Sequence, residues 1–299
     1  MIDQLNNMAL KSNDLHEEVE FLIKDLIPKK MITMFYADGG MGKTWFSYAI
    51  AAYLCKHSFE TVYYLDFDNP IVTLKERKID ELLIDKYPRL NYLQRSKVEL
   101  TPLELIEGLS NKATAHAYNN MTFLIDSIRD VDDINDDKKA MRVMGLLKNI
   151  REAGGTVILV HHANKDGKNY QGSNNIKNSL DCMFKLTKLP SANSCLSVEL
   201  ETQKERGGVR DCAFSVDTEN LELKALVLED AKMSPEQKKF IEQIQAVLKK
   251  HPDGIKQGDL LAAIGSSSSD KTTKAKLDSF EDKYYKQEKQ GNSKIYKKI

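Results

Sequence analysis

The chain has 299 residues, 41% of them hydrophobic and 29% charged, which is typical of a globular protein with room for one large and one small domain. Its formal net charge is zero, which argues against a uniformly basic nucleic-acid-binding protein. No apolar run has the length of a membrane span and the four scattered cysteines lack metal-ligand spacing, so we expect a cytoplasmic protein with free thiols and no membrane contact.

Residues 1–30 are polar and are expected to form an N-terminal arm ahead of the first core strand. A helical pattern at 15–23 precedes Pro28, which would end it because proline lacks the backbone N–H. Such an arm either packs on its own domain or docks on a neighbouring subunit, and the sequence leaves both open.

Residues 37–44 read Ala-Asp-Gly-Gly-Met-Gly-Lys-Thr and lie between an apolar run at 32–36 and a helical pattern at 45–54. A strand, a glycine-rich turn and a helix N-terminus form the context of a phosphate-binding P-loop, although the first position is Ala rather than Gly. We expect Lys43 to reach the β- and γ-phosphates of a nucleoside triphosphate and the Thr44 hydroxyl to ligate Mg²⁺. The residues expected to bind the nucleotide are Gly39, Gly40, Met41, Gly42, Lys43 and Thr44.

Residues 31–230 alternate short apolar strands with helical patterns, which predicts an α/β domain on a mostly parallel sheet with right-handed crossovers. From residue 182 onward, closely spaced strands predict an antiparallel extension of that sheet by hairpins. The strands are expected at 32–36, 61–66, 90–93, 121–126, 156–160, 183–186, 195–200, 213–216 and 221–223. Helices are expected at 45–54, at 71–87, from 102 and at 134–153.

The composition changes near residues 231–235, and we expect a second, small domain at 233–299. This segment holds 14 Lys against 9 Asp and Glu, a net charge of about +5, so the preceding residues carry about −5. Three helical patterns and then a hairpin are the order of a winged helix-turn-helix on duplex DNA, and a small helical domain with solvated lysines is the alternative. The expected DNA contacts are Lys271, Lys274 and Lys276 on the third helix and Lys289 and Lys294 on the hairpin.

The strand at 121–126 ends in Asp126. An acid at the carboxyl end of a buried parallel strand points at the phosphate crevice, so we expect Asp126 to act with Thr44 on the magnesium side of the site. Ser127 is a weaker candidate for the same place.

The order of these motifs resembles RecA-type ATPases, and among them the DnaB and RepA group of hexameric helicases and their RadA-like relatives. The motifs are the P-loop, Tyr64–Pro70, Leu124–Ser127, Val160–His162 and Lys204–Gly207, within a resemblance that covers about residues 18–230. The resemblance implies a RecA-like fold, ATP hydrolysis and a homo-oligomer, expected to be a hexamer.

The resemblance also implies roles for single residues. Asp68 matches the acid that polarises the attacking water, although the family usually has Glu there; a capping role in the turn before Asn69 is the alternative, and Asp66 is the fallback. His162 matches the sensor of the γ-phosphate, or the His pair simply caps the sheet.

Lys204 and Arg206 match a basic pair that reaches the nucleotide of the next subunit, where an arginine finger stabilises the charge on the transferred phosphoryl group. The alternative is an exposed hairpin in which Lys204, Glu205 and Arg206 pair with one another.

Two loops could meet single-stranded DNA. The loop at 129–139 carries five aspartates, which would repel a phosphate backbone. The loop at 163–177 carries Lys165, Lys168 and Tyr170 and suits a single strand, with Tyr170 as a stacking ring; a merely flexible polar loop is the alternative.

These features favour an ATP-dependent DNA helicase or translocase of RecA type in replication or repair. Two alternatives stay open: an ATP-gated DNA-binding initiation or regulatory factor that does not unwind DNA, and a recombination ATPase that forms open filaments.

Overall fold

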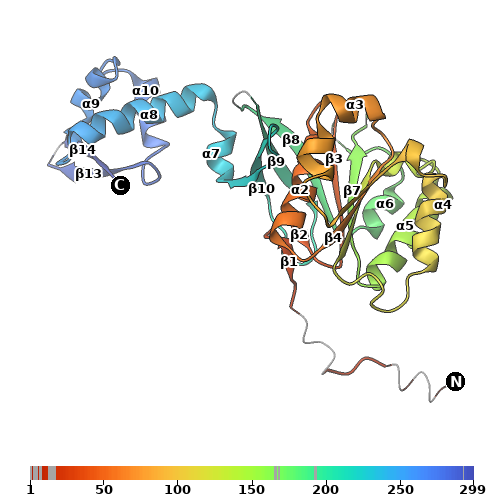
Figure 1. Cartoon of the computed structure of the whole chain (residues 1–299). Coiled ribbons are helices and arrows are strands. Elements are labelled where there is room, and N and C mark those ends of the chain that lie inside the picture. The colour runs from red at the N-terminus through yellow and green to blue at the C-terminus, as the bar shows by residue number, and fades with distance from the viewer. Residues whose placement is uncertain are drawn as a thin grey trace. The chain divides into compact units, whose positions relative to one another are not determined.

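The computed structural model describes residues 2, 6, 9–12, 18–164, 167, 169–191, 194–291 and 293–299. The chain divides into two compact units, Met1–Ala231 and Lys232–Ile299, which are described separately (Figure 1). In the described part of the chain, none of the helices is long and apolar enough to cross a membrane.

The first unit is built on a nine-stranded sheet with the order β11-β10-β9-β8-β3-β7-β6-β4-β5. Its strands are β3 (Ile32–Ala37), β4 (Thr61–Asp66), β5 (Leu90–Gln94), β6 (Met121–Asp126), β7 (Thr156–His162), β8 (Cys182–Leu189), β9 (Cys195–Lys204), β10 (Cys212–Asp217) and β11 (Leu223–Leu226). The strands from β8 to β5 are parallel, and β9, β10 and β11 extend the sheet antiparallel. The predicted α/β fold is confirmed, with one difference: β8 joins β3 in parallel before the antiparallel extension begins.

Helices cover both faces of this sheet (Figure 1). They are α2 (Lys43–His57), α3 (Ile71–Glu76), a π-helix (Asp80–Ile84), α4 (Pro102–Asn111), α5 (Asp137–Glu152), α6 (Asn174–Ser179) and α7 (Leu228–Lys232). One core cluster joins α2 and α3 to one face, and a second joins α4, α5 and α6 to the other. Alternate residues of β3 enter the two clusters, as the period of two in a strand requires. The parallel strands are therefore buried on both sides.

Two local predictions are wrong. The helix expected at 71–87 is interrupted after Glu76, where Lys78 takes a left-handed φ of 54° before the π-helix begins. The helix expected at 15–23 is replaced, where the structure describes the chain, by strand β1 (Phe21–Ile23) pairing with β2 (Ile27–Pro28); residues 13–17 lie outside the described residues. This hairpin forms because Ile23, Leu26 and Ile27 are buried in the main core. At least this part of the expected arm packs on its own domain.

The described residues of the second unit form three helices and a three-stranded sheet with its own apolar core. Its elements are α8 (Pro235–Lys250), β12 (Ile255–Lys256), α9 (Gln257–Ala263), α10 (Lys271–Asp278), β13 (Tyr285–Gln290) and β14 (Ser293–Lys298). A capping box between Ser234 and Gln237 starts α8. β12, which the sequence pattern does not indicate, pairs with the second strand of the hairpin. The core includes Phe240, Ile244, Leu248, Leu277, Tyr285 and Tyr296.

Candidate nucleotide-binding site

The carboxyl ends of β3, β4, β6 and β7 meet around a cavity of about 330 Å³. Loops that follow the carboxyl ends of parallel strands are the usual place for a nucleotide in an open α/β sheet. The residues that line the cavity are Gly39, Gly40, Gly42, Lys43, Thr44, Trp45, Asp68, Asn69, Arg77, Asp126 and His162. The P-loop, Asp68, Asp126 and His162 thus lie together, as the sequence predicts.

The P-loop turns into α2 at Gly42, which caps the helix with a φ of 91°. A side chain there would be doubly unfavourable, since its Cβ would lie 2.5 Å from a methyl group of Leu196. The first backbone N–H groups of α2 have no partner within the helix and favour an anion. The Met41 side chain packs on the core and does not line the cavity, so any contribution of Met41 comes from its backbone.

Lys43 is 8% exposed, and its ammonium donates to the carbonyl oxygens of Ala37 (3.0 Å) and Asp38 (2.9 Å). Burial lowers the pKa of Lys43, and the carboxylates of Asp126, Asp38 and Asp68 act against that shift. A phosphate in the cavity would act in the same direction as the carboxylates and favour the charged ammonium.

Asp126 is 2% exposed and accepts a hydrogen bond from the Tyr64 hydroxyl at 3.1 Å. Burial raises the pKa of Asp126 to about 7, the charge of Asp66 adds to this, and hydrogen bonds from Tyr64 and Thr44 oppose it. The Ser47 hydroxyl of α2 lies 2.6 Å from the Tyr64 hydroxyl oxygen. Tyr64 therefore connects Asp126 to the beginning of the P-loop helix.

The paired oxygens of Thr44 and Asp126 fit Mg²⁺, a hard cation that takes a few protein oxygens and completes its shell with phosphate and water. Among the described residues no group of three or more His, Cys, Asp or Glu side chains could hold a metal by itself. When bound, the ion would neutralise charge on the β- and γ-phosphates. Ser127 donates to Asp130 at 2.6 Å and does not line the cavity, so the structure does not place it in this role.

The structure separates Asp66 from Asp68. Asp66 is fully buried and accepts hydrogen bonds from the Tyr92 hydroxyl (2.5 Å) and from the backbone N–H groups of Asn69 (2.9 Å) and Asp68 (3.2 Å). The turn-capping role considered for Asp68 therefore belongs to Asp66. Asp68 lines the cavity and lies 3.6 Å from the guanidinium of Arg129.

The two histidines at the end of β7 likewise differ in position, one buried in the fold and the other at the cavity. His161 is fully buried, its Nε2 donates to the Gln171 carbonyl at 2.5 Å, and burial lowers its pKa to about 4. His162 lines the cavity, and burial together with the charges of Lys43 and Arg129 lowers its pKa. His161 supports the loop that follows, and His162 is the neutral ring that faces the nucleotide side.

Three cavity residues carry no signal that assigns them to the site from sequence: Trp45, Asn69 and Arg77. Arg129, the partner of Asp68, carries none either. Arg77 follows the break after α3, lies 5.8 Å from the centre of the Trp45 ring and donates to the Asn69 side chain at 3.2 Å. A guanidinium beside an indole forms one wall of the cavity and offers a cation and an aromatic surface to the nucleotide.

Lys204 and Arg206 do not lie at this cavity. Lys204 ends β9 opposite Met183, beside the first residues of β3, whereas the P-loop follows the last residue of β3. Met183 pairs in turn with Met34, so three residues of strand, about 10 Å, and the width of β8 separate the Lys204 backbone from the last residue of β3. Both side chains bind residues 177–181, and neither lines the cavity.

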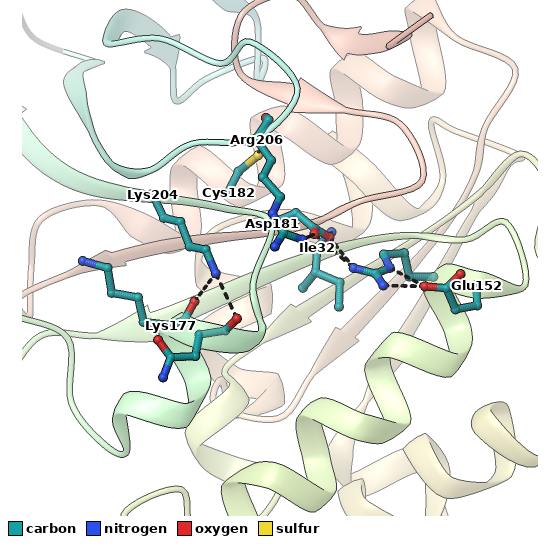
Figure 2. Close-up of polar contacts among 9 residues, drawn as sticks. Ile32, Glu152, Lys177, Asp181, Cys182, Lys204 and Arg206 are labelled. Atoms are coloured by element: carbon teal, nitrogen blue, oxygen red, sulfur yellow. Dashed lines mark hydrogen bonds and ion pairs between the residues drawn. The ribbon is translucent and has the colours of Figure 1, made fainter. Parts of the chain in front are cut away.

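The partners of this pair are shown in Figure 2. Lys204 donates to the carbonyls of Lys177 (2.7 Å) and Asn178 (3.0 Å), and Arg206 pairs with Asp181 at 3.0 Å. Glu205 accepts from the Gly208 N–H. The alternative in which Lys204, Glu205 and Arg206 pair with one another is wrong.

The five aspartates of the loop at 129–139 have structural partners. Asp136 caps α5, Asp132 pairs with Lys139 at 3.1 Å, and Asp137 accepts from Ser173 at 2.5 Å. Asp130 accepts from Ser127, and Asp133 from Asn135. Capping and pairing account for this acidity.

The expected DNA contacts are placed unevenly. Lys165 and Lys168 lie outside the described residues. The half-buried Tyr170 ring packs edge-on against Tyr36, with its hydroxyl donating to the Ser173 carbonyl at 3.2 Å, so it supports the loop more than it offers a free stacking face. In the second unit, Lys271 and Lys289 are exposed and Lys274 is half-exposed.

Two of the remaining lysines of the second unit have partners of their own. Lys276 is half-exposed, and its ammonium lies 4.6 Å from the centre of the Phe240 ring. Lys294 pairs with Asp278 at 3.2 Å, which leaves less of its charge for phosphate.

Residues 6–168, more than half of the chain, match the family described as AAA domain. The chain belongs to the AAA domain family. With the P-loop and the cavity above, this membership makes the first unit a P-loop ATPase domain. The match ends before Lys204 and Arg206, and before the second unit.

Two solved structures are similar to this AAA domain protein. The RadB recombinase shares 16% identity at a TM-score of 0.47 over 67% of this chain and 93% of that chain. Flagellar accessory protein FlaH from Methanocaldococcus jannaschii shares 13% identity at a TM-score of 0.46 over 67% of this chain and 91% of that chain. None of the curated proteins compared with the sequence matches it.

We expect His161 to make the fold sensitive to mild acid. The unfolded chain takes up a proton near the ordinary histidine pKa of 6.5, whereas His161 stays neutral until about pH 4, so stability is lost as the pH falls through that window. The loss from this group between pH 7 and pH 5 is about 2 kcal/mol. In urea titrations, His161→Gln should show a smaller difference between the two pH values than the native protein. The exposed His57→Gln is the control, and parallel pH profiles for all three proteins would contradict the expectation.

Proposed function

We propose that this AAA domain protein hydrolyses ATP as a homo-oligomer, expected to be a hexamer, and moves on or unwinds DNA. The observation that carries the proposal is that Lys204 and Arg206 lie on the edge of the sheet opposite the P-loop. In a head-to-tail assembly, one face of each subunit meets a different face of the next. The basic pair would then lie at the nucleotide of the neighbouring subunit, whereas it does not line the cavity of its own chain.

Within one chain, the cavity residues supply the rest of the reaction. Lys43 and the P-loop N–H groups bind the β- and γ-phosphates, and Thr44 and Asp126 hold the magnesium side. Asp68 orients the attacking water, and the neutral ring of His162 contacts the γ-phosphate. Arg206 from the neighbour stabilises the charge that develops on the transferred group.

For the second unit we propose a winged helix that binds duplex DNA. Its element order supports this: a helix, a short strand, two helices and a hairpin, with β12 pairing to the hairpin. Lys271 on α10 and Lys289 on the hairpin are exposed, which is where the recognition helix and the wing of such a module meet DNA.

A second candidate function is an ATP-gated DNA-binding factor that does not unwind DNA. Asp68 is one methylene shorter than glutamate, and its carboxylate lies 3.6 Å from Arg129. A shorter side chain that is also paired with a guanidinium is less free to align the attacking water, which favours slow hydrolysis and a protein that switches between assembly states.

The deciding experiment measures ATP hydrolysis by the full chain with single-stranded DNA, with duplex DNA and without DNA. A motor predicts stimulation by DNA together with strand displacement from a partial duplex. Absence of stimulation by either DNA would overturn the motor proposal, and ATP-dependent assembly on duplex without displacement would select the regulatory factor. Electron microscopy with ATP and DNA separates closed rings from the open filaments of a recombination ATPase.

We expect Lys271→Ala and Lys289→Ala each to weaken duplex binding about threefold to tenfold and to reduce the slope of log affinity against log salt by about 1. Each removes one exposed charge that would neutralise a phosphate. Lys239→Ala is the matched control, since it removes an exposed lysine from α8 in the same unit. Equal effects in all three variants would show that net charge alone, and not this surface, binds DNA.

A further inference from the structure

Both side chains of the basic pair are held by a single segment, residues 177–181, which begins in the last turn of α6. Lys204 donates to the carbonyls of Lys177 and Asn178, and Arg206 pairs with Asp181 (Figure 2). Two cationic side chains, one at the end of β9 and one in the turn after it, thus share a support that begins at the end of one helix.

Asp181 is the fixed point of this support. It is 3% exposed, and its Oδ2 accepts from the backbone N–H of Ile32 at 2.9 Å. Arg151 of α5 donates to both carboxylate oxygens at 3.0 Å, and Arg206 donates to Oδ1 at 3.0 Å. Because three partners bind the Asp181 carboxylate, its orientation is fixed, and charge-assisted hydrogen bonds fix Arg206 in turn.

Arg206 is anchored at two points and remains accessible beyond them. The buried Cys182 thiol donates to the Arg206 carbonyl at 3.2 Å, which fixes the backbone, and Nη1 is bound to Asp181. The Arg206 side chain is nevertheless 60% exposed, so the rest of its guanidinium is open to a partner. Arg151, by contrast, is 21% exposed and also pairs with Glu152.

We propose that Asp181 is a positioning residue for Arg206: it holds the guanidinium in the place from which Arg206 reaches the nucleotide of the neighbouring subunit. This inference rests on the proposed function, because it assigns Arg206 to that neighbour's site. An anchored arginine has fewer rotamers to lose when it meets a phosphate, and small errors in the placement of a catalytic group cost large factors in rate. Asp181 itself touches no nucleotide.

The test compares Asp181→Asn, Arg206→Ala, the double variant and Arg151→Gln in the full chain at saturating Mg-ATP and under assembling conditions. Asparagine keeps an oxygen for the Ile32 N–H but loses the charge that anchors Arg206. We expect Asp181→Asn to lower kcat about tenfold or more with KM and nucleotide affinity unchanged. The double variant should be no slower than Arg206→Ala, because both changes remove the same interaction.

Arg151→Gln is the matched control, since it removes the other guanidinium from the same carboxylate and should keep kcat within about twofold. Full kcat in Asp181→Asn alongside a slow Arg206→Ala would overturn this inference and leave the proposed function standing. Full kcat in Arg206→Ala would overturn the role in the neighbour's site, and the inference with it. An equally slow Arg151→Gln, or additive losses in the double variant, would show a purely structural role. If Asp181→Asn is unstable, Asp181→Asn/Arg151→Gln replaces it, because no buried guanidinium then loses its partner.

Discussion

Asp126→Asn is expected to lower ATP hydrolysis about 100-fold and, in the same protein, to raise the stability of the nucleotide-free state at pH 8. The first effect follows because asparagine has no charge to offer on the magnesium side of the site. The second follows because the Asp126 carboxylate is buried beside Asp66 and Asp68, which raises its pKa to about 7.

The sign of the stability effect depends on the direction of that shift. A carboxyl whose folded pKa is raised binds its proton more tightly in the folded state, so the native protein loses stability as the pH rises from about 4 to 7. Asparagine carries no charge at any pH and can still accept from Tyr64. The gain at pH 8 should be on the order of 1–3 kcal/mol and should vanish near pH 4.

Asp68→Asn separates the two effects, since Asp68 lines the same cavity but is 36% exposed. It should lower hydrolysis without stabilising the fold. Thermal unfolding without nucleotide at pH 4, 6 and 8 measures the stability of each variant, and a phosphate-release assay measures the rate. A loss of stability in Asp126→Asn at pH 8 would mean that hydrogen bonding, and not charge burial, dominates at this position.

The parts of the site predictable from sequence are those that topology determines. A short apolar run ending in Asp126 predicts a buried strand, and parallel strands bring their carboxyl ends to one edge, so the P-loop, Asp126 and His162 are expected to converge. The same argument places Lys204 at the opposite edge once β9 is known to run antiparallel. Strand direction was enough for both results.

Choices between neighbouring residues could not be predicted, because distant partners decide them. Asp66 is drawn inward by Tyr92, 26 residues away, which leaves Asp68 for the cavity. His161 is bound by the Gln171 carbonyl, which leaves His162 free to face the nucleotide. Sequence spacing contains no information about either hydrogen bond.

The N-terminal error has a related cause. The apolar residues at the end of the helix expected at 15–23 fit a strand equally well, and in the structure Ile23 is buried with Leu26 and Ile27 by a hairpin whose turn places Asp25 at a φ of 62°. Arg77 was missed because its place depends on the interruption of the helix expected at 71–87. Neither the N-terminal hairpin nor the interruption of the helix can be predicted from the hydrophobic pattern.

Arg206→Ala is expected to lower ATP hydrolysis about 1,000-fold or more while nucleotide binding stays intact, because an arginine finger acts on the transition state and not on the bound substrate. Lys43→Ala is expected to be inactive for a different reason, the loss of phosphate binding. Each variant alone should therefore be inactive in ATP hydrolysis. Only a mixture of the two tests whether one subunit completes the active site of another.

In a one-to-one mixture of the two inactive proteins, some interfaces combine the intact P-loop of an Arg206→Ala subunit with the intact arginine of a Lys43→Ala subunit. Random head-to-tail assembly produces this combination at roughly a quarter of interfaces, so the mixture should recover up to roughly a quarter of the native rate. If Arg206 served its own nucleotide, no interface would be complete and the mixture would stay inactive. Arg210→Ala, which removes an exposed arginine close by in the chain, should stay active alone. Recovery in the mixture, with binding unchanged in Arg206→Ala, would show that the P-loop is one half of a site whose other half belongs to the next subunit.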